Sequence, residues 1–538
     1  MRIGVAQLNS TVGDFQGNLD LALDAYEQLV GRGAELVVYP ELFLSGYPPR
    51  DLLLKDSFIE GSRTSLREFS EKTGPTPALI GFPEEIRDSV KVYNSAAWCQ
   101  NSEIHQVFRK KLLPTYDVFD ESRYFETGNS SMIREYKGMR FGVTICEDIW
   151  NLTDQRYSIE PLDELETEAL DHMINLSASP WFAGKEKKRF QLLKEVVRKV
   201  NCSVTYVNAV GANDELLFDG SSSSLDRNGS LQAQSKDFEE HIDIHDLSDQ
   251  PTSQTTDFLE MERLRKALAM GVRDYVLKSG FSKVVIGLSG GIDSAVTAAI
   301  AVDALGAQNV LGISLPSSIS SEHSKQDAKE LAENLGIEFH TISIQSLVSA
   351  ASSELDFLFR DLPEDVTEEN LQARSRGLLL MALSNKFNAL LLTTGNKSEL
   401  AVGYCTLYGD MCGGLAVISD VPKMKVFELA KHFNRPKILI PTNTIEKPPS
   451  AELRPDQKDS DSLPDYETLD AILHAYVEQG NSLQTIIEDG YDPDVVRRII
   501  RLVDLNEYKR KQAAPGLKTS PLAFGVGRRI PIVQKFHN

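Results

Sequence analysis

The chain is organised around the glycine-rich stretch Gly287-Leu288-Ser289-Gly290-Gly291-Ile292-Asp293-Ser294. The run before it, 283–286, predicts a short buried strand, and the alanine-rich run after it, 295–301, predicts the start of a helix. A glycine-rich turn at this junction presents backbone N–H groups at the positive end of the helix, which is a geometry that holds phosphate. Asp293 would repel phosphate unless Mg²⁺ lies between them, so the stretch predicts a phosphate site with a metal ion.

The same stretch lacks the lysine of the P-loop, so it is not that nucleotide-binding motif. An ordinary glycine-rich turn is the plain alternative, but the complete string S-G-G-x-D-S is more specific. It resembles the pyrophosphate-binding loop of the ATP pyrophosphatases, which cleave ATP to AMP and pyrophosphate. The resemblance implies that residues 287–294 bind ATP and that Asp293 is a Mg²⁺ ligand.

The second half of the chain alternates predicted helices with predicted strands. This repeat predicts a doubly wound, Rossmann-like parallel sheet, in which ligands bind at the carboxyl ends of the strands. The glycine-rich stretch and the segments 314–316 and 393–396 all follow predicted strands. Strands are predicted at 283–286, 309–315, 338–344 and 389–393, and helices at 261–278, 321–335 and 368–388.

Two motifs of this half carry polar residues near predicted helix starts. Asn370 and Arg374 lie in Glu-Asn-Leu-Gln-Ala-Arg, and Thr394 and Glu399 lie in Thr-Thr-Gly-Asn-Lys-Ser-Glu. Helix capping explains part of the first motif, but not its Gln and Arg together. Both motifs resemble the NAD synthetase family. The resemblance implies that Asn370 and Arg374 bind deamido-NAD, that Thr394 binds ATP, and that Glu399 binds metal or deamido-NAD.

Three later segments extend the resemblance. Lys423 corresponds to a family lysine that contacts the phosphates of ATP. Lys509 lies in a basic segment that contacts deamido-NAD in the family, although a basic tail is the default interpretation. The segment 447–464 has no packing pattern, and it is either a lid over the active site or a surface loop.

The first half of the chain predicts a layered α/β domain, and three of its strand ends carry reactive side chains. They are Glu41 in Tyr-Pro-Glu, Lys110 in Arg-Lys-Lys-Leu-Leu-Pro, and Cys146 in Ile-Cys-Glu-Asp. Brought together, the carboxylate takes the thiol proton and the lysine stabilises the oxyanion of a tetrahedral intermediate. Taken singly, a cysteine after a strand is more often a small buried hydrophobe, and a lone Glu or Lys a surface group.

The three residues in this order, with these neighbours, resemble the carbon–nitrogen hydrolase (nitrilase) family. The resemblance implies an αββα sandwich with Glu41 as general base, Lys110 as oxyanion stabiliser and Cys146 as nucleophile. The neighbouring Lys111 is the competing choice. The family lysine stands three residues before a leucine, and Leu113 therefore selects Lys110.

The glutamine-using members of that family hold their substrate with a serine-rich turn and a basic residue after it. The corresponding positions are Tyr116, Ser179 and Lys185, and Glu121 is a candidate second carboxylate near the nucleophile. Turn chemistry and surface charge are the alternative explanation for these four residues.

The domain boundary is predicted at the polar segment 247–260, which lacks apolar periodicity and is expected to be a linker. It divides a glutaminase domain, 1–246, from an NAD synthetase domain, 261–538. The serine run 219–230 resembles low-complexity sequence, but its Arg-Asn-Gly is a hairpin signal and predicts two late strands of the first domain.

Charge and cysteine content narrow the class of protein. The chain has 57 Lys and Arg against 78 Asp and Glu, a net charge of −21, which disfavours general binding to nucleic acid. Its five cysteines lack zinc or disulfide spacing and fit a reducing cytoplasm. The start of the sequence predicts a strand rather than a signal peptide, and no apolar run is long enough to span a membrane.

The resemblances together cover nearly the whole chain and point to the glutamine-dependent NAD synthetases. They imply ATP-dependent amidation of deamido-NAD to NAD, with ammonia taken from L-glutamine and with AMP, pyrophosphate and glutamate released. They also imply Mg²⁺ and a homo-oligomer. The alternatives are an ammonia-dependent NAD synthetase with an inactive nitrilase-like domain, and a first domain that acts only in binding or assembly.

Overall fold

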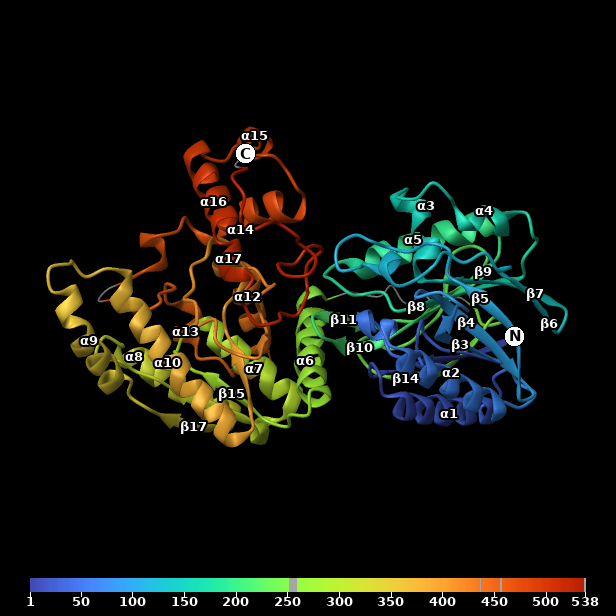
Figure 1. Ribbon diagram of the computed structural model, residues 1–538, viewed down its shortest axis with the longest axis horizontal. Coiled ribbons are helices and arrows are strands. Elements are labelled where there is room, and N and C mark those ends of the chain that lie inside the picture. The colour runs from blue at the N-terminus through green and yellow to red at the C-terminus, as the bar shows by residue number, and fades with distance from the viewer. Residues whose placement is uncertain (251–258, 436, 455–456, 537–538) are drawn as a thin grey trace. The chain divides into compact units, whose positions relative to one another are not determined.

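The computed structural model describes residues 1–250, 259–435, 437–454 and 457–536. It divides into two compact units, residues 1–258 and 259–538 (Figure 1). Most of the linker predicted at 247–260 falls on residues 251–258, outside the described residues. Within the described chain, every helix is too short or too polar to cross a membrane.

The first unit contains two mixed β-sheets and short helical elements around them. Its strands are β1 (Arg2–Gln7), β2 (Leu36–Val38), β3 (Ala78–Glu85), β4 (Val92–Gln100), β5 (Glu103–Arg109), β6 (Ile133–Tyr136), β7 (Met139–Ile145), β8 (His172–Ser177), β9 (Ser203–Asn208), β10 (Val210–Asn213), β11 (Leu216–Asp219), β12 (Ser223–Leu225), β13 (Leu231–Gln234) and β14 (His241–Asp246). Its helices are α1 (Phe15–Gly31), η1 (Arg50–Leu54), α2 (Asp56–Glu71), η2 (Glu121–Arg123), η3 (Cys146–Ile149), α3 (Asn151–Asp154), α4 (Pro161–Glu166) and α5 (Lys185–Val200).

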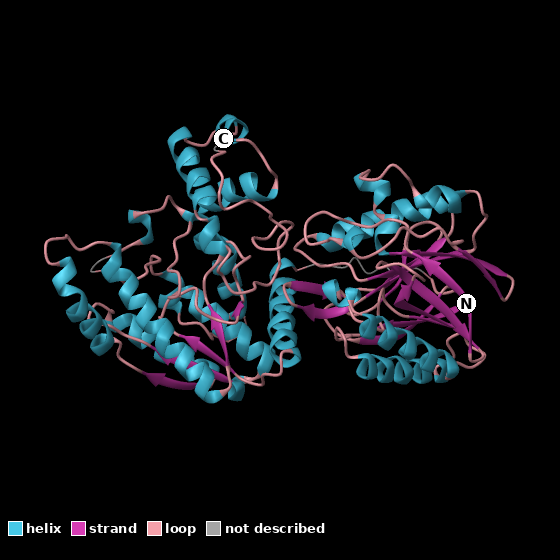
Figure 2. Cartoon of the chain, in the orientation of Figure 1, coloured by secondary structure: helices cyan, strands magenta, loops and turns pink. Residues whose placement is uncertain are grey.

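The two main sheets of this unit each have six strands within the described residues. Their orders are β14-β1-β2-β3-β4-β5 and β13-β12-β9-β8-β7-β6, and β10 and β11 form a separate hairpin. Figure 2 shows the helices of this unit above and below its strands. The two late strands predicted around the serine run are present as β12 and β13, which pair antiparallel.

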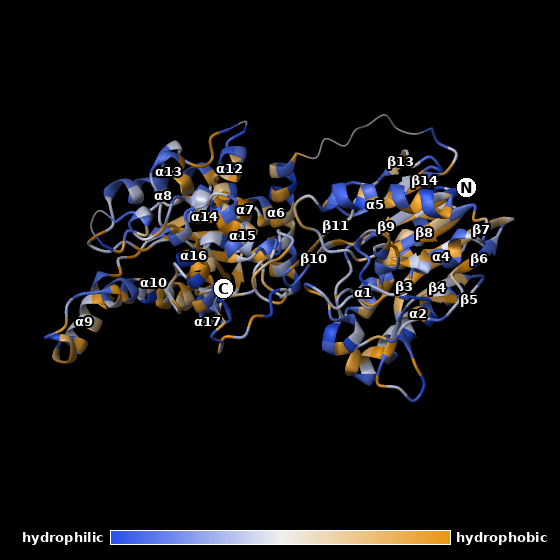
Figure 3. Ribbon diagram, turned by 90° about the horizontal axis from the view of Figure 1, so that it is seen from above, coloured by the Kyte–Doolittle hydropathy of each residue, from blue (hydrophilic) through white to orange (hydrophobic). Residues whose placement is uncertain are grey.

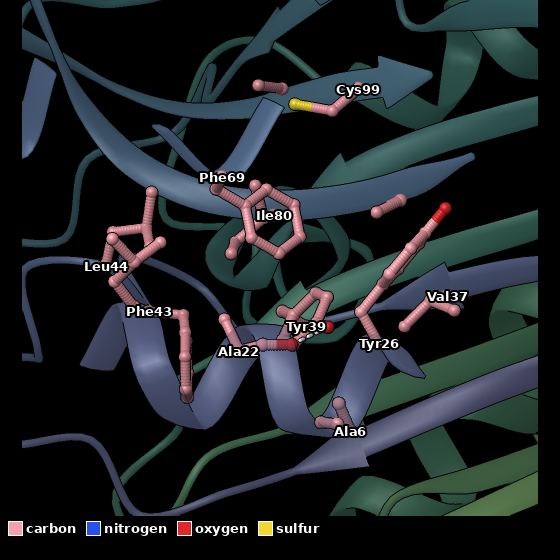
Figure 4. Packing of buried hydrophobic residues seen from close by; sticks show 14 of the residues in the cluster. Ala6, Ala22, Tyr26, Val37, Tyr39, Phe43, Leu44, Phe69, Ile80 and Cys99 are labelled. Carbon is pink, nitrogen blue, oxygen red and sulfur yellow. Dashed lines mark hydrogen bonds between the residues drawn. The ribbon is translucent and has the colours of Figure 1, made fainter. Parts of the chain in front are cut away.

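Three apolar layers explain this arrangement. Alternate residues of β1 point to opposite faces, so Ile3 and Val5 pack between the sheets with Ile174, whereas Ala6 packs toward α1 and α2. Figure 4 shows the second layer, in which the Tyr39 hydroxyl donates to the Ala22 carbonyl of α1 at 2.6 Å. The third layer packs α4 and α5 on the other sheet. The predicted αββα sandwich is therefore confirmed.

The second unit is built on a parallel sheet. Its elements are α6 (Glu260–Lys278), β15 (Val284–Gly287), α7 (Ile292–Leu305), η4 (Ala307–Asn309), β16 (Val310–Ser314), α8 (Glu322–Leu335), β17 (Glu338–Thr341), α9 (Gln345–Phe359), α10 (Val366–Phe387), β18 (Leu390–Thr393), α11 (Lys397–Val402), β19 (Leu415–Ala416), α12 (Lys423–Phe433), α13 (Thr442–Glu446), η5 (Asp459–Asp461), α14 (Tyr466–Leu473), η6 (His474–Glu478), α15 (Leu483–Glu488), α16 (Pro493–Leu505) and α17 (Glu507–Arg510). The strand order is β17-β16-β15-β18-β19, and neighbouring strands of this sheet pair parallel to one another.

This order confirms the predicted doubly wound sheet and locates its switch point. From β15 the chain proceeds outward through β16 and β17, then returns to β18 on the other side of β15. In such sheets the crevice at the carboxyl ends of the two strands that flank the reversal binds ligands. The glycine-rich stretch follows β15 and the segment with Thr394 and Glu399 follows β18, so both lie at this crevice.

Two predicted strands are shorter in the structure. The strand expected to end at Glu41 is only Leu36–Val38, because the chain turns away from the sheet at Pro40, which has no N–H to donate. The strand predicted at 338–344 ends at Thr341, because the chain then approaches the start of α9, a helix that the sequence analysis did not predict.

Candidate active sites

Glu41 and Lys110 meet at one edge of the first sheet. Glu41 follows β2 and Lys110 directly follows β5, and these strands run in the same direction through their pairing with β3 and β4. Both side chains are about 1% exposed. Lys110 Nζ donates to Glu41 Oε1 at 2.7 Å and to Glu121 Oε2 at 2.8 Å. A single buried lysine therefore links two buried carboxylates.

The Glu41 carboxylate is held from two further sides. Asn94 Nδ2 donates to its Oε1 at 2.7 Å, and the Ala178 N–H donates to its Oε2 at 2.9 Å. The turn that carries Glu41 packs against Gly81, where a Cβ would lie 2.3 Å from the Leu42 nitrogen. Glycine at position 81 is thus required for this turn to approach β3.

Cys146 begins η3, directly after β7 of the second sheet. Its φ of 42° lies in the left-handed region, which residues other than glycine rarely adopt and which is frequent at functional sites. Burial and the nearby Glu41 charge raise the pKa of the Cys146 thiol well above its ordinary value, against the opposing effect of Lys110. The resting thiol is therefore protonated and needs a base when it reacts.

The charges around Lys110 fix its protonation. Burial disfavours its ammonium, but Glu121 and Glu41 outweigh burial and raise the pKa of Lys110 well above its usual value. Burial raises the pKa of Glu121 to about 7, against the pull of the Lys110 ammonium. The site thus holds a permanent cation beside a thiol, which is suited to stabilising a developing oxyanion.

The structure separates the two adjacent lysines. Lys111 Nζ contacts both carboxylate oxygens of Glu164 on α4 at 2.6 Å, and Glu164 is largely exposed. Lys111 therefore points away from Glu41, whereas Lys110 contacts it directly.

Two of the three residues predicted to hold glutamine, Tyr116 and Lys185, lie near Glu147, the neighbour of Cys146. The Tyr116 hydroxyl donates to Glu147 Oε1 at 3.0 Å, and the Lys185 charge lowers the pKa of the Glu147 carboxyl, which burial raises overall. Lys185 Nζ also lies 4.3 Å from the centre of the Trp150 ring. Ser179 is buried in the turn after β8, where its N–H donates to Asn208 Oδ1 at 3.0 Å.

In the second unit, the glycine-rich stretch forms a tight turn at the start of α7. The Gly291 N–H donates to Ser289 Oγ at 3.1 Å, and Ser294 Oγ donates to the Gly291 carbonyl at 3.0 Å. Gly290 has a φ of 80°, and a Cβ there would lie 2.3 Å from the Ser324 carbonyl oxygen. The turn therefore needs glycine at position 290, and it leads into a helix of 14 residues whose N-terminus favours anions.

Asp293 and Glu399 share a cation in this crevice, the ammonium of Lys423. Lys423 Nζ lies 2.5 Å from Asp293 Oδ2 and 3.0 Å from Glu399 Oε1. Asn396 Nδ2 donates to the other Asp293 oxygen at 3.0 Å. Burial raises the pKa of Glu399 to about 7, opposed by Lys423. The two carboxylates are thus close enough to hold one positive charge between them.

This pair fits a Mg²⁺ ion that is bound together with substrate. Carboxylate oxygens are hard donors, and Mg²⁺ is commonly held by one or two carboxylates plus phosphate oxygens. Among the described residues, no group of three or more His, Cys, Asp or Glu forms a complete metal site. The ammonium between Asp293 and Glu399 shows that the position accepts a cation.

The residues predicted to bind deamido-NAD converge on the loop after α11. Thr406 Oγ1 donates to Asn370 Oδ1 at 2.8 Å, and Arg374 Nε donates to the Leu407 carbonyl at 3.2 Å. Lys509 Nζ donates to the carbonyls of Gly403 and Cys405 at 2.7 and 2.9 Å. Thr394, the half-buried candidate for ATP binding, is the first residue after β18. One short loop therefore joins α10, the C-terminal region and the helix that carries Glu399.

Comparison with known proteins decides the family. Residues 264–513 match the NAD synthase family and residues 2–158 match the carbon–nitrogen hydrolase family. The glutamine-dependent NAD(+) synthetase of Synechocystis sp. is 49% identical, with 99% of each chain covered. The one from Thermotoga maritima is 44% identical over 100% of this chain and 99% of its own. The chain belongs to the glutamine-dependent NAD(+) synthetases.

Solved structures of this family agree in fold. The glutamine-dependent NAD(+) synthetase from Acinetobacter baumannii, solved with adenosine diphosphate, is 41% identical and superposes with a TM-score of 0.79, covering 99% of this chain and 98% of that one. The one from Cytophaga hutchinsonii, at 23% identity, has a TM-score of 0.85 over 99% and 98% of the two chains, which shows the shared fold. The predicted family, fold and enzyme class, a carbon–nitrogen ligase, are confirmed.

Three residues that contact the candidate site residues of this glutamine-dependent NAD(+) synthetase were not predicted from the sequence. Asn94 and Asn396 orient the carboxylates of Glu41 and Asp293. Asn396 stands in the motif Thr-Thr-Gly-Asn-Lys-Ser-Glu, but the sequence does not show that either asparagine contacts a carboxylate so distant in the chain. Glu147 contacts Tyr116 and lies near Lys185, and the one signal for it in the sequence is its position next to Cys146.

Proposed function

We propose that this chain makes NAD from deamido-NAD, ATP and L-glutamine, releasing AMP, pyrophosphate and glutamate. The observation that carries the proposal is the buried arrangement of Glu41 and Lys110 beside the strained Cys146, in a chain that also contains the phosphate-binding turn 287–294. The first unit would supply ammonia and the second would consume it.

In the first unit, Glu41 takes the Cys146 proton as the sulfur attacks the carboxamide carbon of glutamine. Lys110 stabilises the oxyanion of the tetrahedral intermediate. Glu41 then returns the proton to the leaving nitrogen, so ammonia departs and a thioester remains. Water, deprotonated by Glu41, attacks the thioester, and glutamate leaves as the sulfur regains its proton.

The α-carboxylate and the α-ammonium of glutamine would each be held by side chains of matching charge. Lys185 and the Tyr116 hydroxyl are suited to the α-carboxylate, and the buried turn with Ser179 supplies further polar contacts. The Glu147 carboxylate, beside both Tyr116 and Lys185, is suited to the α-ammonium.

In the second unit, residues 287–294 and Thr394 bind ATP, and Asn370, Arg374, Glu399 and Lys509 bind deamido-NAD. The nicotinate carboxylate attacks the α-phosphorus, the bond to the β-phosphate oxygen breaks, and pyrophosphate leaves. Ammonia then attacks the resulting acyl adenylate, AMP leaves, and the nitrogen loses a proton. Asp293 and Glu399 would hold Mg²⁺, which neutralises phosphate charge when bound.

Lys423 has two roles in this proposal. Without nucleotide, its ammonium neutralises Asp293 and Glu399. With nucleotide, it contacts the phosphates and leaves the two carboxylates to Mg²⁺. The same lysine therefore keeps the site charge-balanced in both states.

The experiment that tests the proposal is C146A assayed for NAD formation with glutamine and with ammonia. We expect loss of the glutamine-supported reaction and retention of the ammonia-supported reaction. Equal loss with both donors would contradict the assigned roles. Full activity of C146A with glutamine would show that Cys146 is not the nucleophile. A wild type that forms NAD with ammonia but not with glutamine would show that the first unit is inert, which is the alternative of an ammonia-dependent enzyme.

The oligomeric state and location are also proposals. We infer a homo-oligomer because α9 has no buried residue, and because large apolar side chains are exposed on α9, α10 and the link between them. They are Phe357, Leu358, Leu362, Val366, Leu378 and Phe387. The five cysteines, all free, fit a reducing cytoplasm.

A further inference from the structure

Asp148 is a buried carboxylate that the mechanism above does not use. It lies in η3, two residues after Cys146, and is 1% exposed. Burial raises the pKa of Asp148 to about 6, while backbone hydrogen bonds and the Lys110 charge oppose that rise. A buried carboxylate is costly unless its oxygens are satisfied, so its partners indicate what it does.

Its partners are backbone N–H groups of two different chain segments. Asp148 Oδ1 accepts from the N–H groups of Lys111 and Leu112, both at 2.9 Å. Its Oδ2 accepts from the Ile145 N–H at 3.0 Å. The first two donors directly follow Lys110, and the third directly precedes Cys146. One side chain therefore joins the segment that carries the lysine to the segment that carries the nucleophile.

The geometry of Cys146 depends on the same contact. A φ of 42° is unfavourable for cysteine and persists only where surrounding contacts hold it. The bond from Ile145 to Asp148 closes the first turn of η3 across Cys146 and thereby holds the residue in this conformation. The bonds to Lys111 and Leu112 fix that turn relative to the end of β5.

We propose that Asp148 is a positioning residue of the glutaminase reaction, which sets the distance between the Cys146 sulfur and the Lys110 ammonium. The proposal rests on the proposed function of the first unit. The hydrogen bonds of the Asp148 carboxylate go to backbone N–H groups and not to the side chains of Glu41, Lys110 or Cys146. It acts through the backbone of both segments.

Asp148 must be ionised for this role, because only a carboxylate offers hydrogen-bond acceptors on both oxygens. In D148N one oxygen becomes an NH₂ group that faces a backbone N–H, so a donor opposes a donor and a buried N–H loses its partner. Small displacements of catalytic groups are costly, and about 1 Å can lower a rate roughly 100-fold.

The test compares D148N with E164Q, which removes the ion pair of Lys111 in the same region but leaves the three backbone bonds intact. For D148N we expect kcat for glutamine hydrolysis to fall roughly 10- to 100-fold with little change in KM, since the glutamine-holding residues are untouched. Ammonia-supported NAD formation should equal wild type. For E164Q both reactions should stay near wild type.

A second readout separates positioning from loss of structure. The pH dependence of Cys146 alkylation by iodoacetamide, followed by mass spectrometry of its peptide, reports the thiol beside Lys110. We expect D148N to shift this profile to higher pH, because the lysine no longer stabilises the thiolate as closely. A wild-type kcat or an unshifted profile would overturn the proposal, as would a loss confined to KM.

Failure of the proposed function is distinguishable from failure of this inference. If C146A keeps glutamine-supported activity, the function assigned to the first unit is wrong. If C146A loses it and D148N does not, only the positioning role is wrong. Should D148N be recovered unfolded, D148E, which keeps both acceptor oxygens on a longer stem, takes its place. Wild-type kcat in folded D148E would then overturn the proposal.

Discussion

At the scale of single residues, the first site depends on one buried lysine between two carboxylates. Lys110 contacts Glu41 and Glu121 while all three side chains are nearly inaccessible. Such a group is costly to break, because removal of the cation leaves uncompensated buried charge. Catalysis and stability are therefore linked at this position.

Substitution K110M tests that link. We expect glutamine hydrolysis to fall by at least about 100-fold, since the oxyanion loses its cation. We also expect the first unit to lose roughly 3–5 kcal/mol at neutral pH, because Glu41 and Glu121 then repel each other. All three tryptophans, Trp98, Trp150 and Trp181, lie in this unit, so their fluorescence during urea unfolding measures it separately. The matched control is K111M, which should keep activity near wild type.

The second site makes a different prediction about Lys423. If Asp293 and Glu399 hold the metal ion as proposed, the Lys423 ammonium competes with it, so K423M should bind Mn²⁺ more tightly than wild type in the absence of nucleotide. We expect a gain on the order of tenfold, or about 1.4 kcal/mol, measured as the loss of free Mn²⁺ signal by electron paramagnetic resonance. Mn²⁺ should also raise the Tm of K423M more than that of wild type.

The control for Lys423 is K425M. Lys425 lies two residues along α12 and pairs with Glu260 and Glu428 instead. It should leave Mn²⁺ binding unchanged. If K423M binds Mn²⁺ no better than K425M does, the lysine does not occupy the metal position.

These contacts explain which site residues the sequence predicts and which it does not. Glu41, Lys110 and Asp293 were predictable because each follows a strand, and the carboxyl ends of parallel strands meet at a known edge of a sheet. The contacts of Asn94, Asn396 and Asp148 were not predictable, since each of them joins a segment distant in sequence. Only the folded chain brings such partners together.

At the scale of helices and strands, the sequence predicts correctly those strands that are buried on both faces of their sheet. β1, β15 and β18 read as continuous apolar runs because both of their faces are covered. α9 was not predicted, and none of its residues is buried. α16 was also not assigned, although Val496, Ile499, Ile500 and Val503 have helical spacing and pack with α11 and α14.

A row of buried, hydrogen-bonded polar side chains crosses the strands of the first unit. His172 Nε2 lies 3.0 Å from Thr205 Oγ1, Thr205 lies 2.7 Å from Ser224 Oγ, and Ser224 lies 2.9 Å from His245 Nδ1. These residues come from β8, β9, β12 and β14. Burial lowers the pKa of His172 to about 3 and that of His245 to about 4. Both histidines are therefore neutral in the folded protein at neutral pH.

The two neutral histidines of this hydrogen-bonded row predict how the stability of the first unit depends on pH. Below about pH 6.5 the unfolded histidines bind protons that the folded ones exclude. Stability is thus unaffected above pH 6.5 and falls as the pH drops toward 4, by at most about 1.4 kcal/mol per pH unit for each histidine. H245N keeps a polar atom near Ser224 but does not titrate, so its tryptophan-detected urea midpoint should fall less steeply. Exposed His105 supplies the control H105N, which should keep the wild-type slope. Equal slopes for H245N and wild type would contradict the assignment.

At the scale of the whole molecule, α9 and α10 stand out because they expose large apolar side chains to solvent. Figure 3 shows hydrophobic stretches along α9. Phe357 is 72% exposed and Leu378 is 63% exposed, and α9 contains only two charged residues, Glu354 and Asp356. Exposed large apolar side chains of this kind are unfavourable in water. A second copy of the same surface would cover them without bringing many like charges together, as in a two-fold symmetric contact.

The double substitution L358E/L378E tests this contact. A glutamate at each position places buried, unpaired charge in any apolar interface, so the mass measured by light scattering after gel filtration should fall to that of one chain. L54E changes a leucine of η1 in the first unit that is 50% exposed, and it should keep the wild-type mass. The contact is absent if the wild type is monomeric at micromolar concentration, and it lies elsewhere if the double variant keeps the wild-type mass. Because α10 carries both Leu378 and the deamido-NAD candidates Asn370 and Arg374, loss of the contact should raise the KM for deamido-NAD more than the KM for glutamine.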